Sequence, residues 1–237
     1  MRTDRNLEEN NLPTDHLIES LRGRLVVSCQ AYPGEPMRTP ETMRRVAQAV
    51  VAGGAAGVRA QGIEDIAEMR AHLTVPIIGL VKEGEDGVFI TPTLDLALAC
   101  VRAGADIVAI DGTRRARPDG RSVAEVIAAV HEAGAAVMVD CAETADVLAC
   151  AEAGADIIGT TLAGYAPGRP KTPGPDLDFV REAAAAVDVP IMAEGRYHAP
   201  ADVEAGFAAG AFSVTVGTAI THPATITTWF AAGAARP

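Results

Sequence analysis

One pattern recurs along this 237-residue chain and constrains its fold more than any other feature. An Ala-rich amphipathic stretch is followed by glycine and then by a short run of β-branched and other apolar residues, at 52–60, 102–112, 132–140, 152–162 and 208–217. Glycine directly after a helix is typical of a left-handed C-cap. A short, almost wholly apolar run is typical of a strand buried on both faces, as in parallel sheets. The pattern therefore predicts repeated helix–strand units around a parallel sheet.

Three further apolar runs, "RLVVSCQ", "VPIIGLVK" and "VPIMAEG", raise the number of expected strands to eight. We place the strands at 25–30, 57–61, 76–82, 107–111, 136–140, 157–161, 190–194 and 213–217, and helices near 41–53, 63–72, 93–103, 122–133, 143–153, 176–187, 200–209 and 223–233. Ser122, and Thr91 or Thr93, are expected to be helix N-caps because their hydroxyls can accept from backbone N–H groups.

Eight alternating β–α units predict a closed parallel (β/α)8 barrel, also called a TIM barrel. We expect a single domain over residues 1–237, with a short extra helix at 15–23 that closes the bottom of the barrel and a loosely ordered segment at 1–14. A doubly wound open sheet is the alternative. That fold usually has a Gly-rich dinucleotide-binding loop after its first strand, and the "AYPGEP" that follows residue 30 does not match it.

The charge balance and the cysteines limit the function classes. A formal net charge of −11 disfavours nucleic acid as a partner, although it leaves room for a small anionic ligand. The first residues are too polar for a signal peptide, and no apolar run reaches the roughly 18 residues of a membrane span. The four cysteines lack metal-type spacing and are expected to be reduced core thiols. We therefore expect a cytoplasmic protein that binds neither nucleic acid nor membranes.

The eight expected strands each end in a polar residue or in glycine. In a (β/α)8 barrel the C-terminal ends of the strands meet at one rim, where the active site lies. Charged side chains at the ends of apolar strands are costly unless they pair with each other or with a ligand. The candidate site residues are therefore Gln30, Arg59, Lys82, Asp111, Asp140, Thr160 with Thr161, Glu194, and Gly217 with Thr218.

Several of these candidates also have a purely structural interpretation. Gln30 could cap backbone groups, and Arg59 could form an ion pair with Asp111 or Asp140. Asp111 could equally belong to a turn, and the segment 159–165 around Thr160 could be loop scaffolding. Lys82 and Glu194 have the strongest functional interpretation, because each ends an otherwise apolar strand.

The loops after the seventh and eighth strands point to a phosphate. In these barrels they often bind phosphate through backbone N–H groups and the N-terminus of a short helix. Here "EGR" (194–196) and "VGTAITHP" (216–223) occupy the two loops. Gly195 lets the backbone approach a ligand closely, and Arg196 adds positive charge. The basic segment "TRRARPDGR" (113–121) is either a substrate gate or a solvated loop. We expect a phosphorylated small molecule as the ligand.

From about residue 21 to residue 229 the chain resembles the N-acetylmannosamine-6-phosphate 2-epimerase family of bacterial sialic acid breakdown. The motifs that carry the resemblance are "VVSCQ", "GVRAQGIEDI", "VPIIGLVK", "FITPT", "AGADIVAIDGT", "RPDG", "MVDCAE", "GTTLAGY", "AEGRY" and "VGTAITHP", in this order. The resemblance implies a phosphate-binding (β/α)8 barrel that interconverts N-acetylmannosamine 6-phosphate and N-acetylglucosamine 6-phosphate without metal or organic cofactor. A homodimer is a possible assembly.

The resemblance also implies roles for individual residues. Lys82 and Glu194 fall on the family's acid and base, and Gln30, Arg59 and Asp140 fall on its supporting residues. Three positions differ from the family's usual pattern: "KEGED" stands for "KRD", "DGT" for "DAT" or "DAS", and His222 for the Arg of "AITR" near the substrate phosphate. Because histidine loses its charge near pH 6.5 in water, we expect phosphate binding to weaken as the pH rises.

The implied reaction suits these residues. Inverting C2 of an open-chain 2-acetamido sugar requires a base on one face, an acid on the other and stabilisation of an enolate-like oxygen. Lys82 and Glu194 are expected on opposite sides of the barrel, and burial or the charge of Arg59 would favour a neutral lysine. The alternatives are a lyase that forms a Schiff base with Lys82 and a non-catalytic sugar-phosphate-binding protein. Nothing in the chain indicates a flavin.

Overall fold

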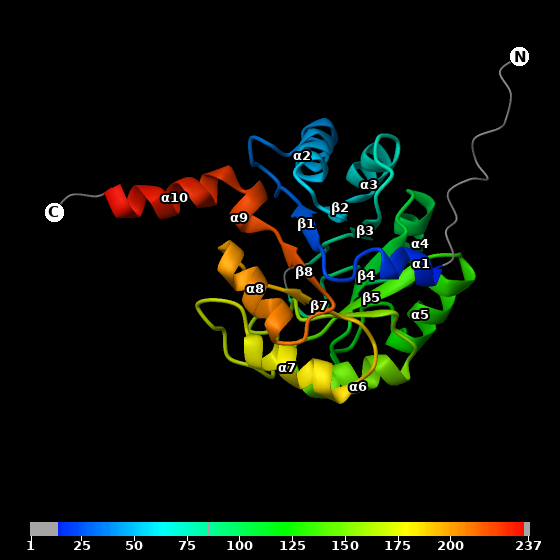
Figure 1. The fold of residues 1–237 in the computed structure, drawn as a ribbon. Coiled ribbons are helices and arrows are strands. Elements are labelled where there is room, and N and C mark those ends of the chain that lie inside the picture. Colours follow the sequence, from blue (N-terminus) through cyan, green and yellow to red (C-terminus); the bar gives the residue numbers. More distant parts are fainter. Residues whose placement is uncertain (1–13, 85, 235–237) are drawn as a thin grey trace, which may run out of the picture.

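The computed structural model describes residues 14–84 and 86–234, and its eight strands form a closed, all-parallel barrel (Figure 1). The strands follow the order of the sequence, and β8 returns to pair with β1. Their bounds are β1 Leu25–Cys29, β2 Gly57–Gln61, β3 Ile77–Leu80, β4 Ile107–Asp111, β5 Ala136–Asp140, β6 Ile157–Gly159, β7 Ile191–Glu194 and β8 Ser213–Val216. The (β/α)8 barrel is therefore confirmed, and the open sheet is excluded. Except for its last residue, the expected segment 1–14 lies outside the described residues.

Helices alternate with the strands as expected. Their bounds are α1 Thr14–Glu19, α2 Pro40–Ala52, α3 Ile63–Arg70, α4 Leu94–Arg102, α5 Val123–Glu132, α6 Thr144–Glu152, α7 Leu177–Ala186, α8 Pro200–Ala208, α9 Thr218–Thr221 and α10 Pro223–Ala234. The glycines of the recurring pattern all have left-handed φ values, from 88° to 105°, at Gly54, Gly104, Gly134, Gly154 and Gly210. A side chain would be strained there, which explains why glycine ends each of these helices.

Some element ends differ from expectation. The strand β3 stops at Leu80, so Lys82 lies beyond it, and β6 stops at Gly159, before Thr160. Thr93 is the N-cap of α4, and Ser122 is the N-cap of α5, with a complete capping box. The helix α9 was not among the helices placed from the sequence pattern, but it lies within 216–223, where the expected phosphate site calls for a short helix.

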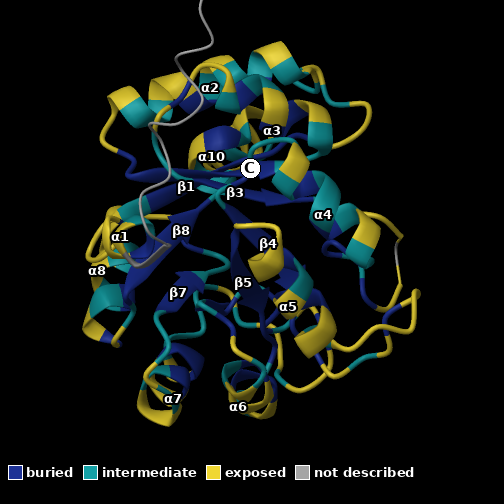
Figure 2. Ribbon diagram, turned by 90° about the vertical axis from the view of Figure 1, so that its right-hand side faces the viewer, coloured by how far each residue is buried: buried dark blue, intermediate teal, exposed yellow. Residues whose placement is uncertain are grey.

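The core has an inner and an outer layer of side chains on the two sides of the strands. The strands themselves are buried (Figure 2). The inner layer fills the barrel with side chains such as Ile78, Ile107, Met138 and Met192. Leu21, just after α1, belongs to this layer and is fully buried, so the leading segment closes one end of the barrel as expected. The site must therefore lie at the opposite end, where the strands finish.

The last helix, α10, extends away from the barrel (Figure 1). None of its residues is buried, and Phe230 is 76 % exposed. In the described part of the chain, no helix is long and apolar enough to cross a membrane.

Candidate active site

A cavity of about 310 Å³ opens at the C-terminal ends of the strands. That volume is at the lower end of the range for small-molecule sites. Most of the expected site residues line it: Gln30, Arg59, Lys82, Glu194, Gly195, Arg196, Gly217, Thr218 and His222. The structure thus brings together residues that lie far apart in the sequence. Asp140 and Thr160 are not among its lining residues.

Lys82 enters this cavity from a short hairpin beyond β3. An isolated antiparallel bridge joins it to Ile90. Its Nζ donates to Oε1 of Gln30 at 2.8 Å, and the hydroxyl of Tyr32 lies 3.4 Å away. No carboxylate in the described part of the chain forms an ion pair with it. Burial, helped by the charge of Arg59, lowers the pKa of Lys82 to about 8. A substantial neutral fraction is therefore available near pH 7 to 8, as a base or a nucleophile requires.

Arg59, from β2, is the hub of a buried network. Its Nη1 donates to Oδ1 of Asp140 at 3.1 Å and to Oγ1 of Thr161 at 3.2 Å, and its Nη2 donates to Oδ2 of Asp140. Nη1 also donates to Oε2 of Glu194. Burial opposes the charge of Arg59, but the two carboxylates outweigh burial and raise its pKa. The expected ion pair is therefore with Asp140 and not with Asp111.

Glu194 ends β7 with its carboxyl group in the cavity. The side chain is 13 % exposed, and Oε2 accepts from Arg59. Burial raises the pKa of Glu194; Arg59 opposes this shift, and the charge of Asp140 adds to it. A carboxyl group whose pKa is raised can hold a proton closer to neutral pH and return it to a ligand.

The expected phosphate end lies at the loops after β7 and β8. Gly195 has a φ of 112°, and Gly217 caps α9, whose first residue is Thr218. A Cβ on Gly217 would lie 3.2 Å from Cβ of Ser28, so a larger residue would crowd the floor of the cavity. His222 ends α9, and its Nδ1 lies 3.8 Å from Oε1 of Glu35.

Two expected ligand residues, Thr160 and Asp140, do not line the cavity, and a third, Arg196, lines it with its donors engaged by a loop. The hydroxyl of Thr160 donates to the carbonyl oxygen of Glu194 and accepts from its N–H, both at 3.0 Å. Thr160 therefore joins β6 to β7, and Thr161 lines the cavity instead. Asp140 is fully buried and accepts hydrogen bonds from Arg59 and Thr161. Arg196 lines the cavity, but its guanidinium donates to the loop 163–174, at 2.8 to 3.0 Å, and braces that loop.

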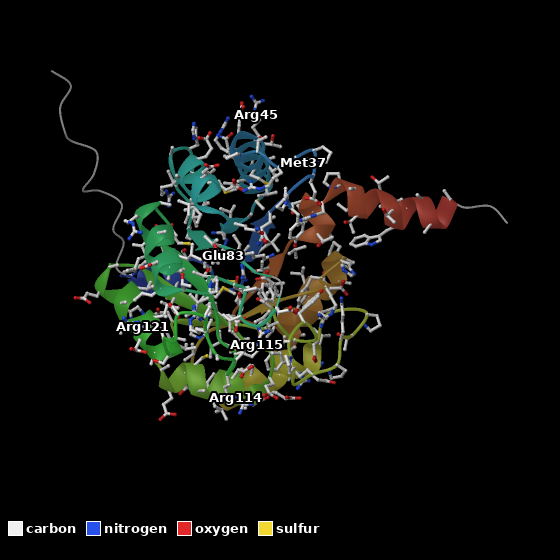
Figure 3. All side chains as sticks on the ribbon, turned by 180° about the vertical axis from the view of Figure 1, so that it is seen from behind. Met37, Arg45, Glu83, Arg114, Arg115 and Arg121 are labelled. Atoms are coloured by element: carbon white, nitrogen blue, oxygen red, sulfur yellow. The ribbon has the colours of Figure 1, made fainter. Side chains whose placement is uncertain are left out.

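The basic segment 113–121 and Asp111 make structural contacts. Arg115 pairs with Asp111 at 2.7 Å, and Arg114 pairs with Glu143. Arg117 is buried and donates to two backbone carbonyl oxygens. None of these arginines lines the cavity. Figure 3 labels Arg114 and Arg115 on the loop after β4. These contacts favour a structural role for the segment, and a substrate gate stays an untested alternative.

Several lining residues were not anticipated. They are Ser28, Tyr32, Phe89, Ile90, Leu162, Tyr165, Tyr197, His198 and Thr215. Ser28 and Thr215 lie two positions before Gln30 and Gly217, so the two-residue alternation of a strand could have found them. Thr215 is 1 % exposed, and its hydroxyl has no hydrogen-bond partner among the residues described. That hydroxyl is therefore free to bind a ligand or water.

Comparisons with known proteins agree with this arrangement. Residues 43–235 match the family model described as "Putative N-acetylmannosamine-6-phosphate epimerase". A Cutibacterium acnes protein named "Putative N-acetylmannosamine-6-phosphate 2-epimerase" is 53 % identical over 220 residues, which cover 92 % of this chain and 96 % of that protein. A protein of the same name from Corynebacterium glutamicum (strain R) is 46 % identical over 225 residues, which cover 93 % and 97 %.

Solved structures were compared in the same way. The N-acetylmannosamine-6-phosphate 2-epimerase from Clostridium perfringens has a TM-score of 0.89 at 34 % identity, covering 92 % of this chain and 96 % of that one. A 3-hexulose-6-phosphate synthase, with a TM-score of 0.60 at 20 % identity over 85 % of this chain and 93 % of that one, shares the fold alone. With its family model, relatives and structural match all in agreement, the chain belongs to the N-acetylmannosamine-6-phosphate epimerase family.

Proposed function

We propose that this protein is an epimerase that interconverts N-acetylmannosamine 6-phosphate and N-acetylglucosamine 6-phosphate at C2. The observation that carries the proposal is a lysine with a pKa of about 8 that shares one cavity with the Arg59–Glu194 pair. A neutral amine and a carboxyl group of raised pKa are the groups that a proton-transfer reaction at carbon requires.

In the proposed mechanism the open-chain sugar binds with its phosphate at Gly195, Gly217, Thr218 and His222. Neutral Lys82 removes or returns the C2 proton on one face, and Glu194 does so on the other. Arg59 and Gln30 stabilise the negative charge that develops on the substrate oxygen. Asp140 holds Arg59 in place and keeps it charged.

Turnover in deuterated water tests this proposal directly. NMR of the product should show solvent deuterium at C2. Lys82→Ala and Glu194→Ala should each lower kcat by at least roughly 10²-fold. Lys171→Ala is the matched control, because Lys171 is exposed and is the only other lysine in the sequence. Near-normal turnover by either cavity variant would remove that residue from the mechanism. Product that keeps its C2 proton would contradict exchange with solvent.

A Schiff-base lyase acting on a sugar phosphate is the second candidate, because an amine with a pKa of about 8 is also a competent nucleophile. Borohydride added during turnover distinguishes the two reactions. A covalent adduct on Lys82, located by mass spectrometry, would support the lyase. Unmodified Lys82 together with deuterium at C2 supports the epimerase.

We propose that the reaction needs neither metal nor organic cofactor. In residues 14–84 and 86–234 there is no cluster of three or more His, Cys, Asp or Glu side chains suited to a metal ion. The acidic residues of the site are engaged with Arg59. Activity that survives exhaustive chelation would support the proposal, and activity lost and then restored by a divalent ion would contradict it. The cytoplasmic location stays a prediction.

We further propose a homodimer, with α10 in the contact between the two copies. The helix extends from the barrel and exposes Trp229 (40 %) and Phe230 (76 %), an apolar surface that a second copy would cover. Sedimentation should give twice the chain mass, and Phe230→Glu should shift it to the monomer while Phe230→Leu should not. A monomeric wild type would contradict this.

A further inference from the structure

The backbone of Val81, directly before Lys82, is held by a single residue, Thr91. The N–H of Thr91 donates to O of Val81 at 2.6 Å, and the N–H of Val81 donates to Oγ1 of Thr91 at 3.1 Å. The next pair along this hairpin is the bridge between Lys82 and Ile90. Both backbone polar groups of Val81 are therefore fixed by Thr91, one residue before the amine that enters the cavity.

Thr91 is itself held from two further sides. Its hydroxyl donates to O of Ala109, on β4, at 2.6 Å. Its carbonyl oxygen accepts from Nη2 of Arg117, whose Nη1 donates to O of Asp111 at 3.1 Å. Thr91 is fully buried, and Arg117 is 6 % exposed. The hairpin is thus anchored to β4 and to the loop that follows it.

The conformation of Thr91 is unusual. Its φ is 44°, in the left-handed region, where a β-branched residue is an outlier. Such a conformation persists only where the surroundings determine it, and such outliers cluster at active sites. Yet neither Thr91 nor Arg117 lines the cavity, so any effect on the chemistry must pass through neighbouring residues that do, such as Lys82 and Ile90.

We propose that Thr91 and Arg117 are positioning residues that fix the backbone before Lys82 and so aim its amine into the cavity. This inference rests on the proposed function, in which Lys82 moves the C2 proton. It gives a purpose to Thr91 in "FITPT" and Arg117 in "RPDG", two motif residues that do not themselves line the cavity. A proton-transferring group must be held within a fraction of an ångström, and its supporting residues do this.

The first test removes one hydroxyl. Thr91→Val keeps the shape and the branching of the side chain and the backbone bond to O of Val81, but loses the hydroxyl's bonds with the N–H of Val81 and with O of Ala109. We expect kcat to fall roughly 10- to 100-fold, the cost of a displaced catalytic group. KM should change little, because Thr91 does not contact the cavity. Thr91→Ser keeps the hydroxyl and should restore kcat. Arg117→Met should resemble Thr91→Val.

A second readout follows Lys82 without any substrate. The chain has two lysines, so the pH dependence of acetylation by acetic anhydride can be followed at Lys82 by mass spectrometry, with exposed Lys171 as internal reference. In the wild type the labelling of Lys82 should rise with a midpoint near pH 8. In Thr91→Val and Arg117→Met that midpoint should move to higher pH, because a displaced amine gains water and leaves Arg59.

Arg114→Met is the matched control. Arg114 lies on the same loop as Arg117, but it is exposed and pairs with Glu143. This variant should keep both the wild-type kcat and the wild-type labelling profile. All measurements are made well below the melting temperature of each variant, determined by circular dichroism, so that loss of fold is not mistaken for loss of position.

Two results would overturn the inference. One is an unchanged kcat and labelling profile in folded Thr91→Val and Arg117→Met. The other is a lower kcat with an unchanged labelling profile, because Lys82 would then still be in place. A wild type without epimerase activity would instead refute the proposed function, and the labelling profiles would still decide whether these residues position Lys82.

Discussion

Arg59 and Lys82, both of which line the cavity, have opposite electrostatic surroundings. Arg59 contacts both carboxylates, Asp140 and Glu194, and its pKa is raised. Lys82 contacts the neutral side chain of Gln30, and burial followed by the charge of Arg59 lowers its pKa to about 8. The carboxylates are thus placed so that one side chain stays charged while the other can lose its proton near neutral pH.

The first residue-level prediction concerns the pH dependence of kcat/KM. In the proposed mechanism Lys82 and Glu194 hold one proton between them, so kcat/KM should be bell-shaped, and its alkaline limb should fall as Lys82 loses its proton near pH 8. Gln30→Glu would put a carboxylate against Nζ and stabilise the ammonium, so the alkaline limb should move to higher pH by roughly 1 unit or more. Initial rates between about pH 6 and 10 test this. An unmoved limb in Gln30→Glu would mean that another group controls the profile.

The second residue-level prediction is that Arg59→Met destabilises the fold strongly. It leaves Asp140 and Glu194 buried without their cation, which typically costs about 3–5 kcal/mol. Urea unfolding measures the loss. Arg59→Met combined with Asp140→Leu should be less destabilised than Arg59→Met alone, because one unpaired charge is gone. Equal losses would argue against the ion pair as the cause.

At the level of elements, the sequence predicted the strands and helices better than the contacts between them. Apolar runs and terminal glycines are local signals, so the eight repeats were placed correctly. Thr160 was assigned to the cavity because β6 was expected to run to residue 161. The strand ends at Gly159, and Thr161 is the residue that lines the cavity.

The hydrogen-bond partners of the polar side chains could not be predicted from the sequence. Arg196 was expected to bind phosphate, but its donors reach the backbone of a loop that approaches only in the folded chain. Thr91 was considered as an N-cap, a local role that Thr93 fulfils. Its contacts with Val81 and Arg117 depend on how the hairpin packs on β4. These contacts are set by three-dimensional packing, which periodicity does not report.

One element-level prediction concerns the start of α5. Ser122 and Glu125 form a reciprocal capping box away from the cavity. Ser122→Ala removes one of the two reciprocal hydrogen bonds of this box and should lower the free energy of unfolding by ~1 kcal/mol. Ser122→Asp, which keeps an acceptor at the cap, should lose much less. Denaturant unfolding provides the measurement, and kcat should be unchanged; a change in kcat would mean that α5 is coupled to the site.

For the whole molecule, Lys82 lowers the free energy of unfolding. Its pKa falls from 10.5 to about 8 on folding, a difference worth up to ~3 kcal/mol against the folded state. Below pH 8 the lysine is protonated in both states and the penalty is complete. Between about pH 8 and 10.5 the unfolded chain binds more protons, so stability rises with pH and the penalty disappears above that window.

Lys82→Met should therefore stabilise the protein at pH 7 while abolishing turnover. The gain in melting temperature should shrink as the pH approaches 10.5, where the wild-type lysine is neutral in both states. Melting curves of the two proteins across this range measure it. A pH-independent difference would assign the gain to packing and not to charge.

The network around Arg59 also bears on how the protein folds. Its partners Asp140 and Glu194 lie 81 and 135 residues further along the chain. Contacts over such separations form late, because the entropy of closing long loops must be overcome first. Arg59→Met should therefore speed unfolding far more than it slows refolding in stopped-flow experiments. The guanidinium of Arg59 contacts both carboxylates only when the barrel is closed. Partly folded chains therefore contain the catalytic residues without the arrangement that makes them active.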